Sequence, residues 1–274
     1  MPKAASRNDP IAVLTDFGYR DHYVGVMKGV IASIAPATPV IDLTHGIPPQ
    51  SIAAGALILA QSWRYFPPRT IFLAVVDPGV GTTRLPIAIA TRSGARFVGP
   101  DNGLLAIAAE EAGIRAIVEL HKPRYRLPIM SATFHGRDIF APAAAWIARG
   151  KSLPALGPRV ASITPPALEG GVTQAAGVLT GAVIYVDGFG NLVTNLSRER
   201  IEAFAGRAPQ DRLSIGLGRR PPIRLRGTYG DAPVGTPLAL FGSFGTLEIA
   251  IRDGHAASLL SAEVGAVVTV ITGR

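Results

Sequence analysis

The first half of the chain alternates short apolar runs with longer segments in which apolar residues recur at helical spacing. The apolar runs predict strands over residues 11–14, 40–43, 71–76, 87–91, 96–98 and 116–119. The helical patterns predict helices over residues 23–34, 52–63, 103–112 and 139–149. This alternation predicts an α/β domain with a mostly parallel central sheet, because parallel strands need a crossover connection, usually a helix.

The pattern changes after residue 152. Prolines and the pair Gly170–Gly171 interrupt every periodic segment over residues 153–172. Short β-rich runs follow and predict strands over residues 177–186, 191–196, 213–217, 223–225, 237–241, 247–251 and 267–271. We therefore predict an N-terminal α/β domain over residues 11–152, a linker over 153–172 and a smaller all-β, barrel-like C-terminal domain over 173–274. Residues 1–10 lack the apolar segment of a signal peptide and predict a flexible leader.

Composition narrows the class of protein. With 48% hydrophobic residues in 274, the chain can bury a large core, which excludes intrinsic disorder. It has no cysteine, which excludes disulfides, thiolate metal sites and a cysteine nucleophile, and this fits a cytoplasmic protein. No apolar run reaches the roughly 18–20 residues that cross a bilayer, so we expect no membrane partner.

The charge is basic: 27 Lys and Arg against 19 Asp and Glu give a net charge of +8. An excess of positive charge suits a polyanionic partner, but nucleic-acid-binding proteins usually gather that charge in one stripe. Here it is scattered in small groups, such as Arg64 with Arg69 and Arg219 with Arg220. We therefore expect no nucleic-acid partner.

Polar residues of the first half stand where predicted strands end. Asp16 follows the first strand, Asp42 and His45 lie at the end of the second, and Asp77 follows the third. The pair Asp101–Asn102 comes after the strand over residues 96–98. Ligands of open α/β sheets bind outside the carboxyl ends of the strands, so this convergence predicts a site. For any single aspartate, a helix cap or a turn is the simpler interpretation.

The segment Asp77-Pro78-Gly79-Val80-Gly81 is glycine-rich, but it lacks the lysine and the spacing of a nucleotide-binding loop. It predicts a tight turn. Such a turn would hold Asp77 rigidly, with Arg84 seven residues further on.

Six motifs carry a specific resemblance. They are TDFGYRDHYVGVMKG (15–29), VVDPGVGTTR (75–84), GPDNG (99–103), FHGRDIFAPAAA (134–145), DGFGNLVTN (187–195) and GSFGTLEIA (242–250). In this order they resemble motifs of the S-adenosylmethionine (SAM) hydroxide adenosyltransferase family, the SAM hydrolases, which are relatives of the fluorinating and chlorinating SAM enzymes. The likeness covers nearly the whole chain after the leader.

The resemblance implies a reaction and an assembly. Water displaces methionine from C5′ of SAM, giving adenosine and L-methionine, with SAM as substrate and with no cofactor or metal. The family fold is an α/β domain followed by a β-barrel domain, and the resemblance implies a homotrimer with active sites at the subunit interfaces. The family's catalytic Asp, Arg and His match Asp77, Arg84 and His135.

Further positions match substrate contacts of the family. Asp16 matches the carboxylate that binds both ribose hydroxyls, and Phe134 matches the aromatic residue near the ribose. In the C-terminal half, the positions that match contacts to methionine or adenine are Asp187, Asn191 and Ser243. Glu248 matches the family by motif alone.

The chain departs from the halogenating relatives. They carry Tyr and Thr where Asp77 and Val80 stand, and a halide-contacting Ser where Gly136 stands, so we expect hydrolysis and no halogenation. Three residues of the C-terminal motifs, Gly188, Val193 and Phe244, also differ from those common in the related enzymes. These differences affect the contacts expected with the methionine part of the substrate.

The chemistry of the three matched residues suggests their roles. The sulfonium leaves as a neutral thioether, so only the water needs activation. Arg84 beside Asp77 should stabilise the ionised carboxylate, which makes Asp77 a poor proton acceptor. We therefore expect Asp77 and Arg84 to orient the water and His135 to accept the proton, since histidine titrates near neutral pH. The other histidines are interpreted as structural or surface groups: His22, His45, His121 and His255.

Two other functions compete with this one. A metal-dependent phosphohydrolase could use oxygen and imidazole ligands from Asp16, Asp42, His45, Asp101, Asn102 and His135, although their spacing is not that of a metal motif. A non-catalytic oligomer could bind nucleosides or RNA through its arginines, with an affinity that falls steeply with salt.

Overall fold

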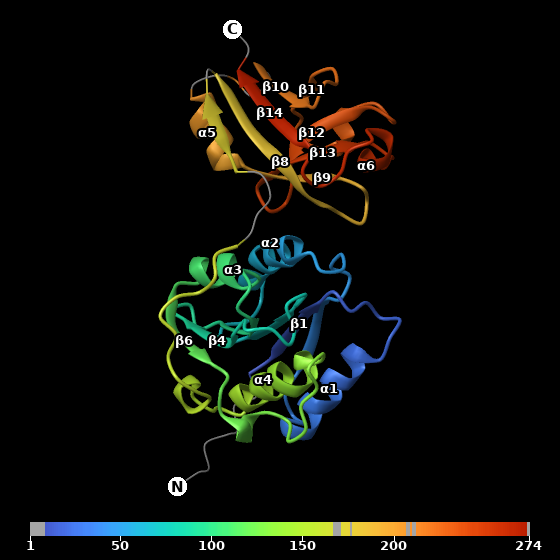
Figure 1. Ribbon diagram of the computed structural model, residues 1–274. Coiled ribbons are helices and arrows are strands. Elements are labelled where there is room, and N and C mark those ends of the chain that lie inside the picture. Colours follow the sequence, from blue (N-terminus) through green and yellow to red (C-terminus); the bar gives the residue numbers. More distant parts are fainter. Residues whose placement is uncertain (1–8, 167–170, 176, 207–208, 210–211, 273–274) are drawn as a thin grey trace. The chain divides into compact units, whose positions relative to one another are not determined.

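The computed structural model describes all residues except 1–8, 167–170, 176, 207–208, 210–211 and 273–274 (Figure 1). Most of the leader expected over residues 1–10 and part of the expected linker therefore lie outside the described residues. The chain divides into two compact units, residues 1–167 and 168–274, which we treat separately. In the part of the chain that the structure describes, no helix combines the length and the apolarity needed to span a membrane.

The N-terminal unit is built on a six-stranded sheet in the order β2-β1-β3-β5-β4-β6. Its strands are β1 (Ile11–Thr15), β2 (Val40–Thr44), β3 (Ile71–Val75), β4 (Pro86–Thr91), β5 (Arg96–Pro100) and β6 (Ile114–Glu119). β1 and β3, at its centre, are buried at every residue, which explains their unbroken apolar runs.

The sheet is mixed, but every strand except β4 runs in the same direction, which is consistent with the expected mostly parallel sheet. β2, β1, β3 and β5 are parallel neighbours, whereas β4 pairs antiparallel with both β5 and β6. The cause is local: β4 and β5 are joined by a tight turn through Gly94, whose φ of 94° closes a hairpin. A connection this short cannot make the crossover that a parallel pair needs.

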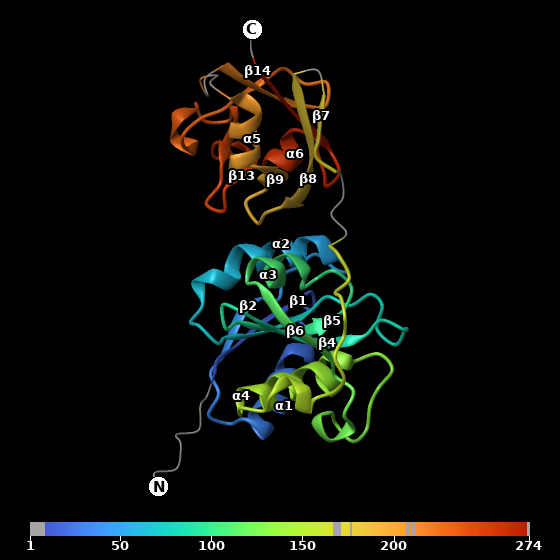
Figure 2. The ribbon, with the colours of Figure 1, turned by 90° about the vertical axis from the view of Figure 1, so that its left-hand side faces the viewer.

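Helices cover both faces of this sheet: α1 and α4 lie against one face, and α2 and α3 against the other (Figures 1 and 2). The helices are α1 (Tyr23–Ile34), α2 (Ile52–Ser62), α3 (Ala106–Glu111) and α4 (Ala141–Ala148), with 3-10 turns at Trp63–Tyr65, Pro123–Tyr125 and Leu153–Ala155. The helix expected over residues 139–149 is preceded by a π-helical turn, Gly136–Phe140, directly after His135. Such turns often occur at functional sites.

The C-terminal unit is an eight-stranded antiparallel sheet in the order β11-β10-β14-β8-β9-β13-β12, with β7 paired to β8. Backbone contacts of Leu225 and Arg226 with Ala239 link the end of β11 to β12, so the sheet curls into a nearly closed barrel. The strands are β7 (Thr173–Ala175), β8 (Val178–Val186), β9 (Leu192–Ser197), β10 (Leu213–Leu217), β11 (Ile223–Arg224), β12 (Pro237–Phe241), β13 (Thr246–Ile251) and β14 (Val267–Thr272). The helical segments are α5 (Arg198–Ala205), α6 (Ala256–Leu259) and a 3-10 turn, Tyr229–Asp231.

Candidate active site

The N-terminal cavity lies at the carboxyl ends of β1 and β3 and has a volume of about 330 Å³. Asp16 follows β1, Asp77 lies two residues beyond β3, and the loop before the π-helical turn brings Phe134 and His135. The residues that line the cavity are Asp16, Phe17, Gln50, Val75, Asp77, Pro78, Val80, Thr133, Phe134, His135 and Gly136. The edge of the sheet thus brings together four residues that the sequence singled out, Asp16, Asp77, Phe134 and His135, whereas Arg84, Asp42, His45, Asp101 and Asn102 do not line the cavity.

Arg84 joins the two other matched catalytic residues. Its Nε donates to Asp77 Oδ1 at 2.9 Å, and its Nη2 forms an ion pair with Asp77 Oδ2. The same Nη2 lies 2.7 Å from His135 Nδ1. The side chains of Asp77 and Arg84 are buried, with exposed fractions of 6% and 9%. The arrangement is therefore a desolvated, two-pronged ion pair with a histidine attached to its cationic end.

A close approach between two loops sets this geometry. The turn after β3 is closed by the bond from Val80 N to Asp77 O. Gly81 has a φ of 79°, and a Cβ at this position would lie 2.7 Å from the carbonyl oxygen of Ala132, in the loop that carries His135. Only glycine fits there without strain, which explains Gly81.

The bond with Arg84 fixes the tautomer of His135. A guanidinium can only donate hydrogen bonds, so Nδ1 of His135 must accept, and the proton of the neutral ring lies on Nε2. Burial, together with the positive charge of Arg84, lowers the pKa of His135 below its usual 6.5. The ring is therefore neutral at pH 7, and its lone pair is already used. This geometry argues against the expectation that His135 accepts the proton from water.

The loop that carries Phe134 and His135 is anchored by a buried carboxylate. Asp138 is fully buried, and its Oδ2 accepts from Ser131 N at 2.7 Å while its Oδ1 accepts from Arg137 Nε at 2.6 Å. The guanidinium of Arg137 lies over the Phe134 ring, 5.2 Å from its centroid. The expected position of Phe134 beside the cavity thus rests on fixed neighbours.

Asp16 faces the same cavity from the other side. Its Oδ2 accepts a hydrogen bond from Gln50 N at 2.8 Å. Oδ1 has no hydrogen-bond partner recorded among the described residues. A carboxylate in this state can accept hydrogen bonds from two neighbouring hydroxyl groups of a ligand.

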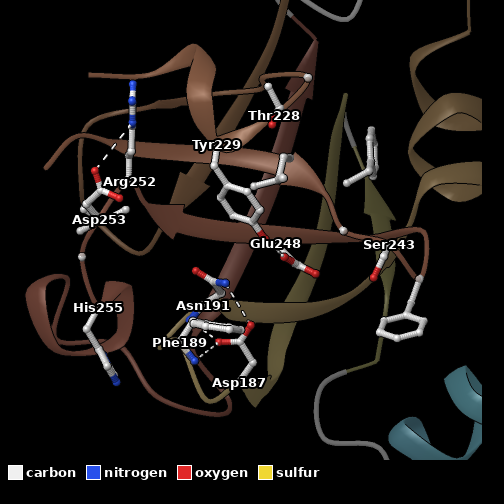
Figure 3. Close-up of a pocket in the computed structure, with 17 residues that line it drawn as sticks. Asp187, Phe189, Asn191, Thr228, Tyr229, Ser243, Glu248, Arg252, Asp253 and His255 are labelled. Carbon is white, nitrogen blue, oxygen red and sulfur yellow. Dashed lines mark hydrogen bonds and ion pairs between the residues drawn. The ribbon is translucent and has the colours of Figure 1, made fainter. Parts of the chain in front are cut away.

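The C-terminal pocket is larger, about 980 Å³, and Figure 3 shows its lining side chains. Asp187 shapes one edge: its Oδ1 accepts from Phe189 N and Asn191 N at 2.9 and 2.8 Å, and its Oδ2 accepts from Asn191 Nδ2 at 3.0 Å. The pocket is lined by Asp187, Phe189, Asn191, Gly227, Thr228, Tyr229, Leu240, Phe241, Gly242, Ser243, Phe244, Glu248, Ile251, Arg252, Asp253, Gly254 and His255. All four C-terminal residues singled out by sequence are among them.

Glu248 and Tyr229 form a hydrogen-bonded pair within this pocket. Tyr229 Oη donates to Glu248 Oε2 at 3.0 Å. Burial raises the pKa of Tyr229 to about 12, and the neighbouring Glu248 adds to the shift. Burial, with the negative charge of Asp187, raises the pKa of Glu248. Gly242 leaves room for this carboxyl group, since a Cβ there would lie 1.7 Å from Glu248 Oε1.

Sequence reasoning missed Tyr229, Phe189 and Gln50. Phe189 stands inside a recognised motif and is 82% exposed at the pocket edge, an unusual position for phenylalanine. Tyr229 lies in a loop with no periodic pattern, and nothing in the sequence ties it to Glu248. Gln50 contributes through its backbone N–H, which no side-chain pattern reports.

The six residues of the metal hypothesis do not converge. Asp101 Oδ1 accepts from Thr164 N at 2.8 Å, and Asn102 donates to a backbone carbonyl group. Asp42 and His45 contact each other, and neither lines the N-terminal cavity that Asp16 and His135 share. Across the described part of the chain, no three His, Asp or Glu side chains are grouped so that they could hold a metal ion.

Comparison with known proteins identifies the family. Residues 11–157 match the SAM hydroxide adenosyltransferase N-terminal domain, and residues 181–269 match the C-terminal domain of the same family. The chain belongs to the SAM hydroxide adenosyltransferase family.

Members of this family resemble the chain over nearly its whole length. An (R)-S-adenosyl-L-methionine hydrolase of Thermus thermophilus is 41% identical over 263 residues, covering 93% of this chain and 97% of the relative. The protein of the same name from Salinispora tropica is 42% identical over 265 residues, covering 96% of this chain and 98% of the relative. A fluorinase of Actinoplanes is more distant, at 29% identity over 293 residues, 97% of this chain and 98% of the relative.

A solved structure shares the fold of this chain. A crystal structure of an uncharacterized conserved protein from Thermotoga maritima is 36% identical and superposes with a TM-score of 0.87. It covers 95% of this chain and 99% of that one. The two-domain architecture described above is therefore that of a known fold.

Proposed function

We propose that this member of the family hydrolyses S-adenosyl-L-methionine to adenosine and L-methionine. The observation that carries the proposal is that Asp77 and His135, bridged by Arg84, line one cavity with Asp16, in a chain about 41% identical to SAM hydrolases. The fluorinase is more distant, and Asp77 and Gly136 replace residues expected of halogenating members. These two observations favour water over halide as the nucleophile.

In this mechanism the N-terminal cavity presents water to C5′ of the substrate. The ion pair of Asp77 and Arg84 is fixed by two contacts, so the carboxylate is oriented before substrate binds. A water held by Asp77 and by Nε2–H of His135 would approach C5′ opposite the sulfur. Holding the reactants in line removes entropy from the barrier, an effect worth several kcal/mol.

The fate of the proton follows from the charges. When the oxygen–C5′ bond forms, the C5′–sulfur electron pair returns to sulfur and methionine leaves as a neutral thioether. The new bond leaves a protonated alcohol, which is a strong acid, so even a carboxylate paired with arginine can accept its proton. We assign that role to Asp77, while Arg84 keeps His135 neutral and correctly oriented.

The C-terminal pocket supplies charge that suits a cationic substrate. Asp187 and Glu248 bring two carboxyl groups into one pocket, and no Lys or Arg among the described residues forms an ion pair with either. SAM carries a sulfonium and an ammonium group. Asn191 and Ser243 add polar groups for the remainder of the substrate.

Product analysis tests this function. The purified protein is incubated with the (R) and the (S) sulfonium epimers of SAM, with and without EDTA, and the products are separated by chromatography. We expect adenosine and methionine in equal amounts, faster from the (R) epimer for which the relatives are named, and unchanged by EDTA. Activity that EDTA abolishes would favour the metal-dependent alternative, and intact SAM would refute the proposal.

The oligomeric state and the cellular location are part of the same proposal. As the family resemblance implies, we propose a cytoplasmic homotrimer whose active sites combine the two half-sites from neighbouring subunits. Co-expression of the impaired variants Asp77→Asn and Asp187→Ala, assayed at a SAM concentration far below the KM of Asp187→Ala, tests this, because mixed oligomers would contain some sites intact in both halves. We expect the mixed oligomers to recover activity. Mixed trimers without activity would contradict active sites that are shared between subunits.

We propose no nucleic-acid partner, because many arginines already have internal partners. Arg69 and Arg96 bind Asp9, Arg126 binds the carbonyl group of Leu120, and Arg137 binds its neighbouring carboxylate. RNA binding that falls steeply with salt would contradict this.

A further inference from the structure

Three hydrogen bonds join the segment that carries Asp16 to the segment after β2. Gly18 N donates to His45 O at 2.8 Å, and Gln50 N donates to Asp16 Oδ2 at 2.8 Å. The third connects side chains: Thr15 Oγ1 lies 2.8 Å from His45 Nδ1. Two of the three involve His45, although its side chain does not line the cavity.

His45 is held from both sides in the interior. The residue is 1% exposed, and its Nε2 lies 3.1 Å from Asp42 Oδ1. This contact has the length of an ion pair, but its geometry does not meet the criteria of a hydrogen bond. Because a carboxylate only accepts, the ring N–H faces Asp42 and Nδ1 accepts from the Thr15 hydroxyl. Tyr19 covers the ring edge-on, with 5.0 Å between centroids.

Asp42 is in turn anchored by a lysine on α1. Lys28 Nζ donates to Asp42 Oδ2 at 2.7 Å. Burial raises the pKa of Asp42, but the bond from Lys28 and the contact with His45 outweigh it, so the pKa is below its ordinary value. The chain Lys28–Asp42–His45–Thr15 therefore runs from a helix to the residue directly before Asp16.

The backbone at Gln50 points to the purpose of this arrangement. Gln50 has a φ of 65°, in the left-handed region that a residue other than glycine rarely adopts. In this conformation its N–H binds the Asp16 carboxylate. Strain of this kind persists where the surrounding structure enforces it, and it concentrates at binding sites.

We propose that His45 is a positioning residue for Asp16, holding its carboxylate in the orientation that binds a vicinal diol. The proposal rests on the proposed function, since the diol is that of the substrate's ribose. His45 acts through Thr15 and through its own carbonyl group, which together fix both ends of the turn over residues 15–18. This replaces the interpretation of His45 as a purely structural histidine.

A purely structural histidine would behave differently from a positioning one. Loss of packing alone would weaken all nucleosides alike, whereas loss of the Asp16 orientation would weaken only ligands with hydroxyls at C2′ and C3′. The ratio of the dissociation constants for 2′,3′-dideoxyadenosine and adenosine therefore isolates the positioning role.

The experiment measures both dissociation constants by calorimetry on the full chain, for the wild type and four variants. In His45→Ala we expect adenosine to bind about tenfold more weakly, the loss of roughly one hydrogen bond to a charged group, with dideoxyadenosine unchanged. His45→Asn should recover part of the loss, since its amide can accept from Thr15. Thr15→Val, which keeps the shape of the buried side chain, should reproduce the effect and serves if His45→Ala does not fold.

His121→Ala is the matched control, because His121 is exposed and its side chain forms a polar contact only with Glu119 among the described residues. It should bind both nucleosides as the wild type does. A preserved ratio in His45→Ala or in Thr15→Val would overturn the positioning role, and so would a wild type that binds the two nucleosides equally. Diol discrimination by a wild type that leaves SAM intact would instead refute the proposed reaction and leave the positioning role standing.

Discussion

The N-terminal cavity and the C-terminal pocket treat their charged groups differently. In the cavity, Asp77 is bound at both oxygens by Arg84, which also holds His135. In the pocket, Asp187 is held by backbone N–H groups and an amide, and Glu248 by a phenol. The first arrangement compensates its charge internally, whereas the second leaves negative charge uncompensated.

This difference suggests a division of labour. A compensated ion pair is rigid and already desolvated, which suits the orientation of a small neutral nucleophile. Uncompensated carboxyl groups are costly to bury, as the raised pKa of Glu248, caused first by burial, illustrates. Binding of a cationic substrate would relieve that cost. Mutations of the Asp77–Arg84–His135 cluster should therefore affect turnover, and mutations in the C-terminal pocket should affect substrate affinity.

The largest effect is expected for Asp77→Asn. The amide keeps the size of the side chain but cannot form the ion pair with Arg84 or accept the proton. We expect kcat to fall about 10³-fold, the range of lost acid–base and orienting groups, with KM for SAM changed little. Steady-state kinetics measure both constants. A variant with altered KM and normal kcat would reverse the roles of the two regions.

His135→Asn should lower kcat about 10–100-fold and change its pH dependence. Burial and Arg84 lower the pKa of His135, so the ring is neutral above 6.5 and gains a proton only at more acid pH. That proton would occupy Nδ1 and break the bond with Arg84. Wild-type kcat should therefore fall on the acid side below pH 6.5.

The pH profile of the His135→Asn variant provides the check. Its acid limb should disappear, because asparagine does not titrate while its amide oxygen can still accept from Arg84. An acid limb that is unchanged in the variant would remove His135 as the titrating group.

Asp16→Ala extends the comparison to the N-terminal cavity itself, because we propose that Asp16 binds the ribose whereas Asp77 takes part in the reaction. We expect adenosine to bind at least about tenfold more weakly, because two charge-assisted hydrogen bonds are lost. Calorimetric titration with adenosine measures the change. Unaltered affinity would remove Asp16 from the site.

The smallest effect is expected for Glu248→Gln in the C-terminal pocket. Glutamine keeps an acceptor for Tyr229 but removes a carboxyl group whose ionised form is disfavoured by burial. The raised pKa means that the ionised form destabilises the fold above the ordinary pKa, so Tm at pH 7 should be equal or rise by about 1–3 °C.

In Glu248→Gln, KM for SAM should rise several-fold with little change in kcat. Scanning calorimetry and steady-state kinetics give the two readouts. A large loss of kcat with unchanged KM would place Glu248 in the chemistry and break the division between the regions.

The elements that sequence predicted best are strands buried along their whole length and helices with a regular apolar face. β1 and β3 are continuous apolar runs, and α1 spans residues 23–34 as expected, because its apolar face follows the helical period. α5 was missed, since only Ile201 of its eight residues is buried and its start depends on a cap by Ser197. β4 was predicted as a strand, but its antiparallel direction was missed because one short turn, and no periodicity, decides that direction.

The candidate active site could also be predicted from the sequence only in part. The aspartates at strand ends were visible in sequence because the topology of a parallel sheet brings such ends together. The bond from Arg84 to His135 and the pair of Tyr229 with Glu248 join residues far apart in the chain, through loops without a pattern. Such contacts decide proton positions, which explains why the role that we propose for His135 differs from the one expected from sequence.

The most direct test follows the oxygen atom. The protein is incubated with SAM in ¹⁸O-labelled water, and the adenosine and methionine formed are analysed by mass spectrometry. Direct attack of water on C5′ predicts one ¹⁸O atom in the 5′-hydroxyl group of adenosine and none in methionine. Adenosine without label, or no cleavage of SAM, would contradict the account.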